Sequence, residues 1–318
     1  MKQVKLWGVA LAAAMTVLGA SAQTKEEVGL KMKEAGELIN NKKLVEAIPV
    51  VEEVIKMGQA VGADAVDITS EAQKLLPKLY LQKGVESVRA QKLDEAIAAF
   101  EKAENLADLQ GDVMTTRQAG RFVSNIYMSI GITSFNAKDY TKALESFQKG
   151  LKQDPENIQL AYFTAKSYAE MGQLEQAMEL YKQVIAAGTE NSKYAKQATD
   201  AKADMDNYML VAASEAAQAG DIEKVQTYVA AVPENADANL LLIQTANNLK
   251  KYDVVVAKGA DAYAAQTDDA KKGDVAFLIG VAYQNKGNNA KAAEWLRKVT
   301  AGSNVAAAKE LLTSVTAA

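Results

Sequence analysis

The amino-acid sequence predicts an all-α protein. Its 318 residues include 58 alanines, the best helix former, and only four prolines, which interrupt helices. A hydrophobic fraction of 49% is enough to bury a core. Apolar residues recur at helical spacing on both sides of short turns, so the expected helices come in pairs. We therefore expect a succession of helical hairpins.

The N-terminus carries a different signal. Two lysines precede an apolar run at 6–19, which ends in small residues up to Ala22. This layout is typical of a secretory signal peptide, and the run is shorter than the roughly 20 residues that span a bilayer. We predict a signal peptide at 1–22 and an exported mature chain at 23–318, without a membrane span. The expected location is the periplasm of a bacterial envelope, with full secretion as the alternative.

The clearest two hairpins occupy 124–191. In the first, Gly131 precedes the turn, and Ala143 and Phe147 follow it. Ala177, the counterpart of Ala143, lies 34 residues further on. A small residue on each helix lets two helices approach closely, and a large one fills the space beside them. These residues predict two copies of one packing unit.

Weaker copies extend this pattern along the chain. Wider intervals between them predict lengthened helices at 112–137 and 192–218, and 304–316 is predicted to be a final capping helix. Pro49 and Pro77 fall inside expected helices, where we expect a kink or a late helix start. The anchor residues of the seven copies, 30 to 49 residues apart, are Ala47, Ala96, Ala143, Ala177, Val225, Val255 and Ala292.

This arrangement resembles the tetratricopeptide repeat family, whose unit is a helix-turn-helix of 34 residues with small residues at the helix crossing. The resemblance is good for 124–191, fair for 77–108 and 274–301, and poor between 192 and 270. It implies a right-handed superhelical α-solenoid of about seven hairpins plus a C-terminal capping helix, with a concave inner face. We expect 23–318 to form a single domain of this kind.

Composition excludes several classes of function. The chain has no histidine and no cysteine, which removes Ser-His-Asp triads, cysteine nucleophiles, iron–sulfur clusters and His or Cys zinc sites. A formal net charge of −4 argues against nucleic-acid binding. Calcium-loop and phosphate-loop motifs are also absent from the sequence. We expect no cofactor and no metal.

Two patterns keep an enzymatic alternative open. Ser146 and Lys149 have the Ser-x-x-Lys spacing of penicillin-recognising hydrolases. The pairs 52–53 and 268–269 are adjacent carboxylates, the residue type that glycosidases use. We interpret all of them as packing or solvated surface and predict a protein that is not an enzyme. An envelope hydrolase acting on a cell-wall or glycan substrate is the alternative, and a purely structural subunit is a third possibility.

The predicted function is a scaffold that binds a protein or peptide of the cell envelope through its concave face. Residues on the first helix of each hairpin that do not pack against a neighbouring helix are expected to point into the concave face. Their amides can pair with an extended peptide backbone, and their aromatic rings supply contact area. The alternative is that Tyr162 or Phe163 packs between repeats. The family's clamp for a terminal carboxylate is not supported, because apolar residues, Ile132 among them, occupy that kind of surface. The candidate residues are Asn125, Met128, Ser129, Gln159, Tyr162, Phe163 and Lys166.

Overall fold

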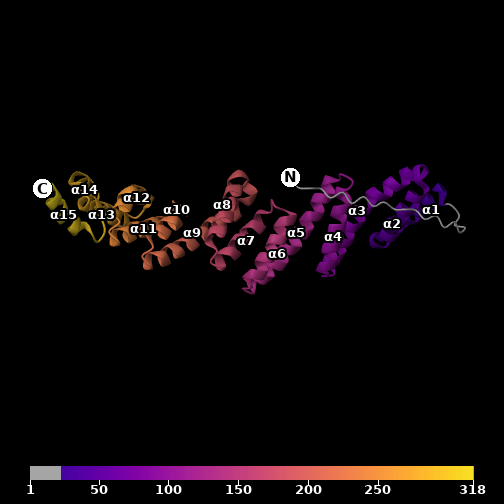
Figure 1. Cartoon of the computed structure of the whole chain (residues 1–318), viewed down its shortest axis with the longest axis horizontal. Helices are drawn as coiled ribbons and strands as arrows, with labels where there is room; N and C mark the ends of the chain where they lie inside the picture. The colour runs from indigo at the N-terminus through magenta and orange to yellow at the C-terminus, as the bar shows by residue number, and fades with distance from the viewer. Residues whose placement is uncertain (1–22, 318) are drawn as a thin grey trace, which may run out of the picture. The chain divides into compact units, whose positions relative to one another are not determined.

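The computed structural model describes residues 23–317, and these residues form α-helices and two short 3₁₀ turns, without a strand. The predicted signal peptide at 1–22 lies outside the described residues. The helices form seven successive hairpins followed by one last helix (Figure 1). The hairpins are α1 (Lys25–Asn40) with α2 (Leu44–Val61), α3 (Val66–Arg89) with α4 (Leu93–Asp108), α5 (Val113–Asn136) with α6 (Tyr140–Gln153), α7 (Ile158–Glu170) with α8 (Leu174–Glu190), α9 (Ala195–Gln218) with α10 (Ile222–Ala231), α11 (Ala236–Asn248) with α12 (Tyr252–Ala265), and α13 (Asp269–Asn285) with α14 (Asn289–Leu296); the last helix is α15 (Val305–Ala317).

This architecture confirms the predicted fold class, with seven hairpins and a capping helix in the part of the chain that is described. The chain divides into two compact units, the first ending at Ile126 and the second beginning at Tyr127, so the border falls inside α5. That α5 and α9 are lengthened is also confirmed, since each has 24 residues. The prediction of one domain over 23–318 stays a prediction.

Every hairpin turn has the same backbone design. The central residue of the turn adopts a left-handed conformation. Its backbone N–H donates to the carbonyl of the third residue before it, and the N–H of the following residue donates to the carbonyl of the fifth residue before that one. This is the Schellman motif, which satisfies the last carbonyls of a helix. Glycine fits this conformation best, but four of the seven positions hold other residues. The seven residues are Lys42, Gln91, Lys138, Gly172, Gly220, Lys250 and Gly287.

In the hairpin of α3 with α4 and that of α5 with α6, the two helices meet through a glycine and a phenylalanine. A Cβ atom added at Gly84 on α3 would lie 2.5 Å from the ring of Phe100 on α4. Gly131 on α5 and Phe147 on α6 repeat this contact in the second unit. Both phenylalanines are fully buried. The spacing of small and large residues in the sequence therefore reports a real packing contact.

Of the two expectations for Pro49 and Pro77, a kink or a late helix start, the late start is wrong. Pro49 lies inside α2 and Pro77 inside α3, each several residues after the helix begins. Pro77 cannot donate to the carbonyl of Gln73, four residues earlier. The side-chain Nε2 of Gln110 donates to that carbonyl instead, at 2.9 Å. A side chain from beyond the next helix thus supplies the hydrogen bond that proline removes.

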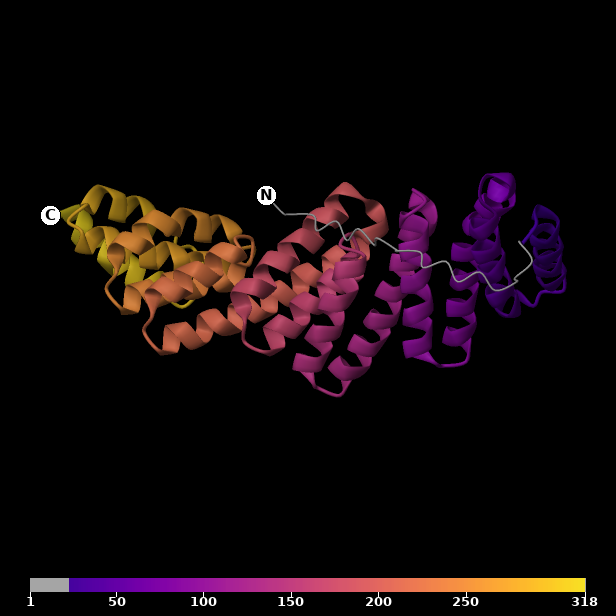
Figure 2. The ribbon, with the colours of Figure 1, turned by 45° about the vertical axis from the view of Figure 1, so that its right-hand side comes forward.

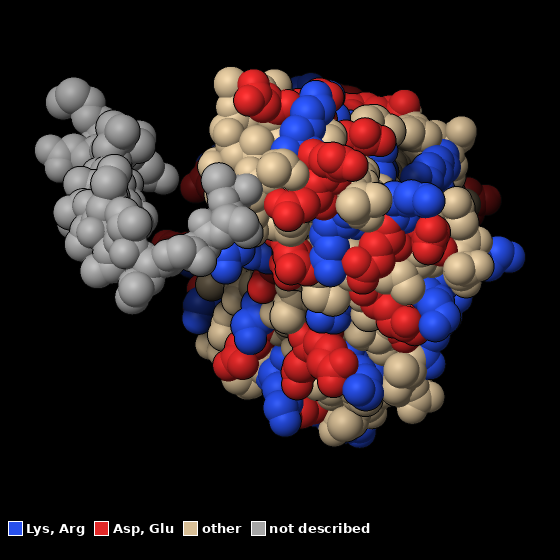
Figure 3. Space-filling view, turned by 90° about the vertical axis from the view of Figure 1, so that its right-hand side faces the viewer, with Lys and Arg blue, Asp and Glu red and all other residues tan. Residues whose placement is uncertain are grey.

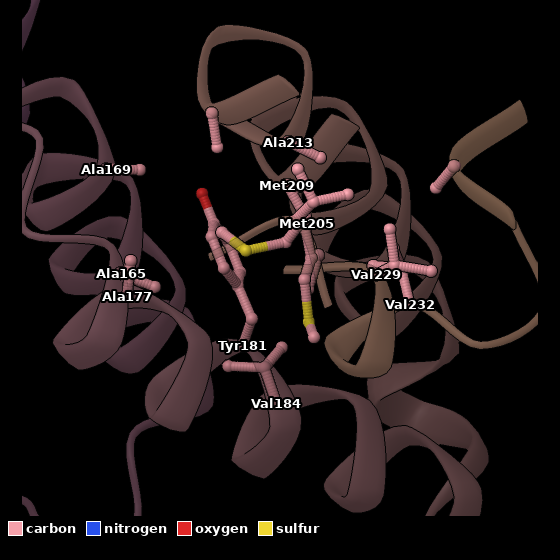
Figure 4. Close-up of a cluster of buried hydrophobic side chains, with 14 of the residues drawn as sticks. Ala165, Ala169, Ala177, Tyr181, Val184, Met205, Met209, Ala213, Val229 and Val232 are labelled. Carbon is pink, nitrogen blue, oxygen red and sulfur yellow. The ribbon is translucent and has the colours of Figure 1, made fainter. Parts of the chain in front are cut away.

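Hairpins stack in sequence order within each unit, as the side-by-side helix pairs in Figure 2 show. In the second unit a continuous apolar cluster joins α7 to α11, with Tyr181, Met205 and Met209 among its buried members (Figure 4). No hairpin could bury its apolar face alone, so neighbouring hairpins stabilise one another.

The surface is polar and mixed in charge. On the face seen in Figure 3, lysine and arginine are interspersed with aspartate and glutamate. Among residues 23–317, no helix is both long enough and apolar enough to cross a membrane.

Candidate functional site

The first helices of successive hairpins form the inner surface of the second unit. There α7 contacts α9, α9 contacts α11, and α11 contacts α13. The second helices pack chiefly on the first helices beside them. Closely spaced first helices place their free side on the inside of a curved stack, so this side of α7 and α9, with the adjoining part of α5, is the candidate surface and is called the inner surface below.

Several predicted residues lie on this surface with their side chains accessible. Ser129 on α5 and Gln159 on α7 are exposed, and Met128 is half-buried beside the cluster that contains Phe147. Asn125 is exposed on the part of α5 that belongs to the first unit. The two exposed residues of the second unit are therefore available for contact with a partner.

Phe163 has a mainly structural position. Its ring stacks on that of Phe147, with centroids 5.6 Å apart, and meets Phe135 edge-on at 6.2 Å. The side chain is only half-buried, so one edge of the ring reaches the surface. The alternative interpretation, in which this residue packs between repeats, describes its contacts well.

Tyr162 and Lys166 both engage one carboxylate on the next first helix. The hydroxyl of Tyr162 donates to Oδ2 of Asp204 on α9, at 2.7 Å, and Nζ of Lys166 lies 3.2 Å from the same oxygen. Lys166 also lies over the Tyr162 ring, 5.5 Å from its centroid. Burial, together with the hydrogen bond to Asp204, raises the pKa of Tyr162, so its hydroxyl stays protonated as a donor.

A second pair joins the same helices in the opposite direction. The hydroxyl of Tyr208 on α9 donates to Oε1 of Glu170, the last residue of α7. Burial and this carboxylate raise the pKa of Tyr208 as well. The two tyrosine–carboxylate pairs fix the register of α7 against α9 and form a polar, aromatic patch on the inner surface.

The hydroxyl of Tyr181 lies behind this patch. Tyr181 is on α8 and is fully buried, and its hydroxyl has no hydrogen-bond partner in the described part of the chain. Figure 4 shows the oxygen directed between Ala169 of α7 and Met209 of α9. Burial raises the pKa of this phenol, and the charge of Asp204 adds to the effect.

Sequence reasoning found Tyr162 and Lys166 but missed the carboxylates and the buried phenol. The available signal was helical spacing: Tyr162, Lys166 and Glu170 are four residues apart in turn, as are Asp204 and Tyr208. Such spacing puts residues on one face of a helix without showing which helix that face meets. Tyr181 lies four residues after Ala177, at a position where the repeat pattern asks only for a large residue.

The residues of the enzymatic alternative have separate contacts. Ser146 donates to the carbonyl of Lys142 at 2.9 Å, and the ammonium of Lys149 lies over the Tyr127 ring. Among the carboxylate pairs, Glu52 accepts from Tyr80 and Asp268 caps α13. No group of three or more potential metal ligands occurs within 23–317.

Comparison with known proteins gives two family matches. Residues 135–199 and residues 273–301 each match a model of the tetratricopeptide repeat. The first segment includes α6, α7 and α8, and the second includes most of α13 and all of α14. No protein of curated function matches the chain.

Solved structures that match the chain include MamA, YrrB and the TPR2AB domain of yeast Sti1. MamA is 24% identical, with a TM-score of 0.29, and the match covers 56% of this chain and 90% of MamA. YrrB, described as a TPR protein with an unusual peptide-binding site, is 17% identical, with a TM-score of 0.27 and coverages of 61% and 91%. The TPR2AB domain of yeast Sti1, in complex with pHSP90, is 14% identical, with a TM-score of 0.30 and coverages of 76% and 98%.

The matching segments lie in separate parts of the chain, and each coincides with helical hairpins of the kind that repeats throughout the described residues. The chain therefore contains tetratricopeptide repeats at 135–199 and 273–301.

Proposed function

We propose that the protein is an exported, non-enzymatic scaffold that binds a protein or peptide along its inner surface. Tetratricopeptide repeats support a role as a protein–protein interaction scaffold. The observation that carries the proposal is the inner surface of α5, α7 and α9, where exposed polar residues lie beside half-buried aromatic rings. Such a mixture is typical of surfaces that bind peptides through many weak contacts.

The test compares two double variants of the protein. Ser129→Arg with Gln159→Arg places two bulky cations on the inner surface, while Thr141→Arg with Gln176→Arg places them at exposed positions on the second helices α6 and α8. Partners are captured from a cell-envelope extract, and the captured protein is then purified and its complex reconstituted. We expect the inner-surface variant to weaken the reconstituted complex at least about tenfold, which corresponds to about 1.4 kcal/mol. Equal weakening by both variants, or by neither, would contradict the proposal.

Export is the second part of the proposal. The lysine-flanked apolar run and the small residues up to Ala22 support a signal peptide. The first helix starts shortly after the expected cleavage point, with Thr24 and Glu27 forming a capping box. Mass spectrometry of the protein from the periplasm and the medium of the expressing cells is expected to find a chain that begins at Gln23. A chain found only in the cytoplasm with residues 1–22 intact would contradict export.

A further inference from the structure

The patch between α7 and α9 carries one negative charge that no cation balances. Lys166 pairs with Asp204, and Lys196 pairs with Asp200 at 2.9 Å. Glu170 accepts a hydrogen bond from the neutral hydroxyl of Tyr208, and the phenol of Tyr140 also interacts with its carboxylate. Both partners are neutral, and the ion pairs found within 23–317 do not include Glu170. Because Glu170 is exposed, its charge is available to a cation that approaches the inner surface.

The same patch contains a buried polar group that lacks a partner. The Tyr181 hydroxyl is directed between α7 and α9, and Tyr162 and Tyr208 pack against the cluster to which Tyr181 belongs. The negative charges of Asp204 and Glu170 both act on this hydroxyl. Buried hydroxyls are normally hydrogen-bonded, and each exception requires an explanation. A ligand that frees the hydroxyl of Tyr208 from Glu170 would give the Tyr181 hydroxyl a hydrogen-bond partner.

We propose that this patch binds an arginine side chain of the partner, with its guanidinium paired to Glu170 and stacked on the ring of Tyr208. The inference rests on the proposed function, since it places a segment of the bound protein on the inner surface. A guanidinium is planar, makes two parallel hydrogen bonds to one carboxylate and stacks on aromatic faces. Lysine offers only a compact charge and cannot form the paired bonds.

Arginine binding also accounts for the buried phenol. When the guanidinium takes both oxygens of Glu170, the hydroxyl of Tyr208 is released from that carboxylate. Its O–H is then free to donate to the oxygen of Tyr181 behind it, and the remaining N–H groups of the guanidinium face Asp204. The bound state therefore satisfies a group that the free protein leaves without a partner.

The experiment measures binding of three small probes to the protein by ligand-observed NMR. The probes are N-acetyl-arginine N-methylamide, its lysine counterpart and its citrulline counterpart, which has the shape of arginine without the charge. We expect the arginine probe to bind, the lysine probe to bind more weakly and the citrulline probe not to bind. Glu170→Gln is expected to weaken arginine binding about tenfold, whereas the matched control Glu175→Gln, an exposed acid on α8, leaves it unchanged.

Tyr181→Phe gives an independent readout. It is expected to weaken arginine binding several-fold without reducing the stability of the folded chain, because the hydroxyl it removes has no partner in the free protein. Equal binding of citrulline or lysine, or an unchanged affinity in Glu170→Gln, would overturn the assignment. A partner complex that is weakened by the Ser129 and Gln159 double variant but indifferent to Glu170→Gln would refute the arginine site and leave the scaffold intact. Indifference to both changes would refute both proposals.

Discussion

The close contact between Gly84 and Phe100 makes a quantitative prediction about the hairpin of α3 and α4. In Gly84→Ala the new Cβ would lie 2.5, 2.6 and 2.7 Å from three atoms of the Phe100 ring. The ring cannot easily move, since it is fully buried and stacks on Phe122 at 4.8 Å. Overpacking of this kind costs about 1–3 kcal/mol. Replacing a helical glycine by alanine returns about 1 kcal/mol of helix propensity, so the net destabilisation is up to about 2 kcal/mol.

Gly36→Ala is the matched control, because Gly36 lies within α1 of the same unit and nothing lies within 4 Å of an added Cβ. This variant gains helix propensity without the steric cost and is expected to be more stable than the wild type by about 1 kcal/mol. The propensity terms cancel between the two variants, so the difference in free energy of unfolding measures the steric term, about 1–3 kcal/mol.

Hydrogen-exchange mass spectrometry is the suitable assay, because it reports the stability of each hairpin separately in a chain that need not unfold in one step. Exchange in α3 and α4 is expected to accelerate in Gly84→Ala, and exchange in α1 to slow in Gly36→Ala. The double variant Gly84→Ala with Phe100→Leu should lose most of the steric penalty. Similar stabilisation by the two alanines, or no coupling to Phe100, would refute the packing argument.

Three further predictions concern phenols and turns. Tyr181→Phe removes an unpartnered buried hydroxyl, so urea unfolding should show a gain of about 1 kcal/mol; a loss would mean that the hydroxyl has a partner in solution. Burial and the hydrogen bond to Glu52 raise the pKa of Tyr80 to about 12, above the ordinary phenol value near 10. The contribution of Tyr80 is therefore fully present below pH 10 and is lost as the pH rises toward 12, and tyrosinate absorbance should show a titration near pH 12 that Tyr80→Phe removes. Lys138→Gly should stabilise and Gly172→Ala should destabilise the chain, each by about 1 kcal/mol in thermal or urea unfolding, since both positions have positive φ; opposite signs would contradict the turn geometry.

The fold could be predicted because its determinants lie close together in sequence. Gly131 and Phe147 belong to one hairpin, and their spacing alone brings them into contact. The position of Pro77 could not be judged in this way, because the bond that replaces its missing donor comes from Gln110, which lies beyond the following helix. Local patterns predict a hairpin. Whether a helix of that hairpin can accommodate a proline depends on hydrogen bonds from neighbouring parts of the chain.

The candidate site was predictable only in part for the same reason. Lys166 and Tyr162 could be placed on the inner side of α7, but Asp204, their shared partner, is 38 to 42 residues away and on another helix. Which face of α9 meets α7 depends on the packing of the whole hairpin between them. The buried, unpartnered hydroxyl of Tyr181 could not be predicted from the sequence, because any large residue at this position would match the repeat pattern.

The seven identical hairpin turns have a consequence for how this chain can change over time. Their geometry comes from main-chain bonding, and the central position accepts lysine or glutamine as well as glycine. Substitutions at the central turn residues can therefore accumulate while the angle between the two helices of each hairpin is kept. A hairpin that is duplicated or exchanged would keep the same turn geometry. The protein can therefore gain length or new contact residues without a change in its helical architecture.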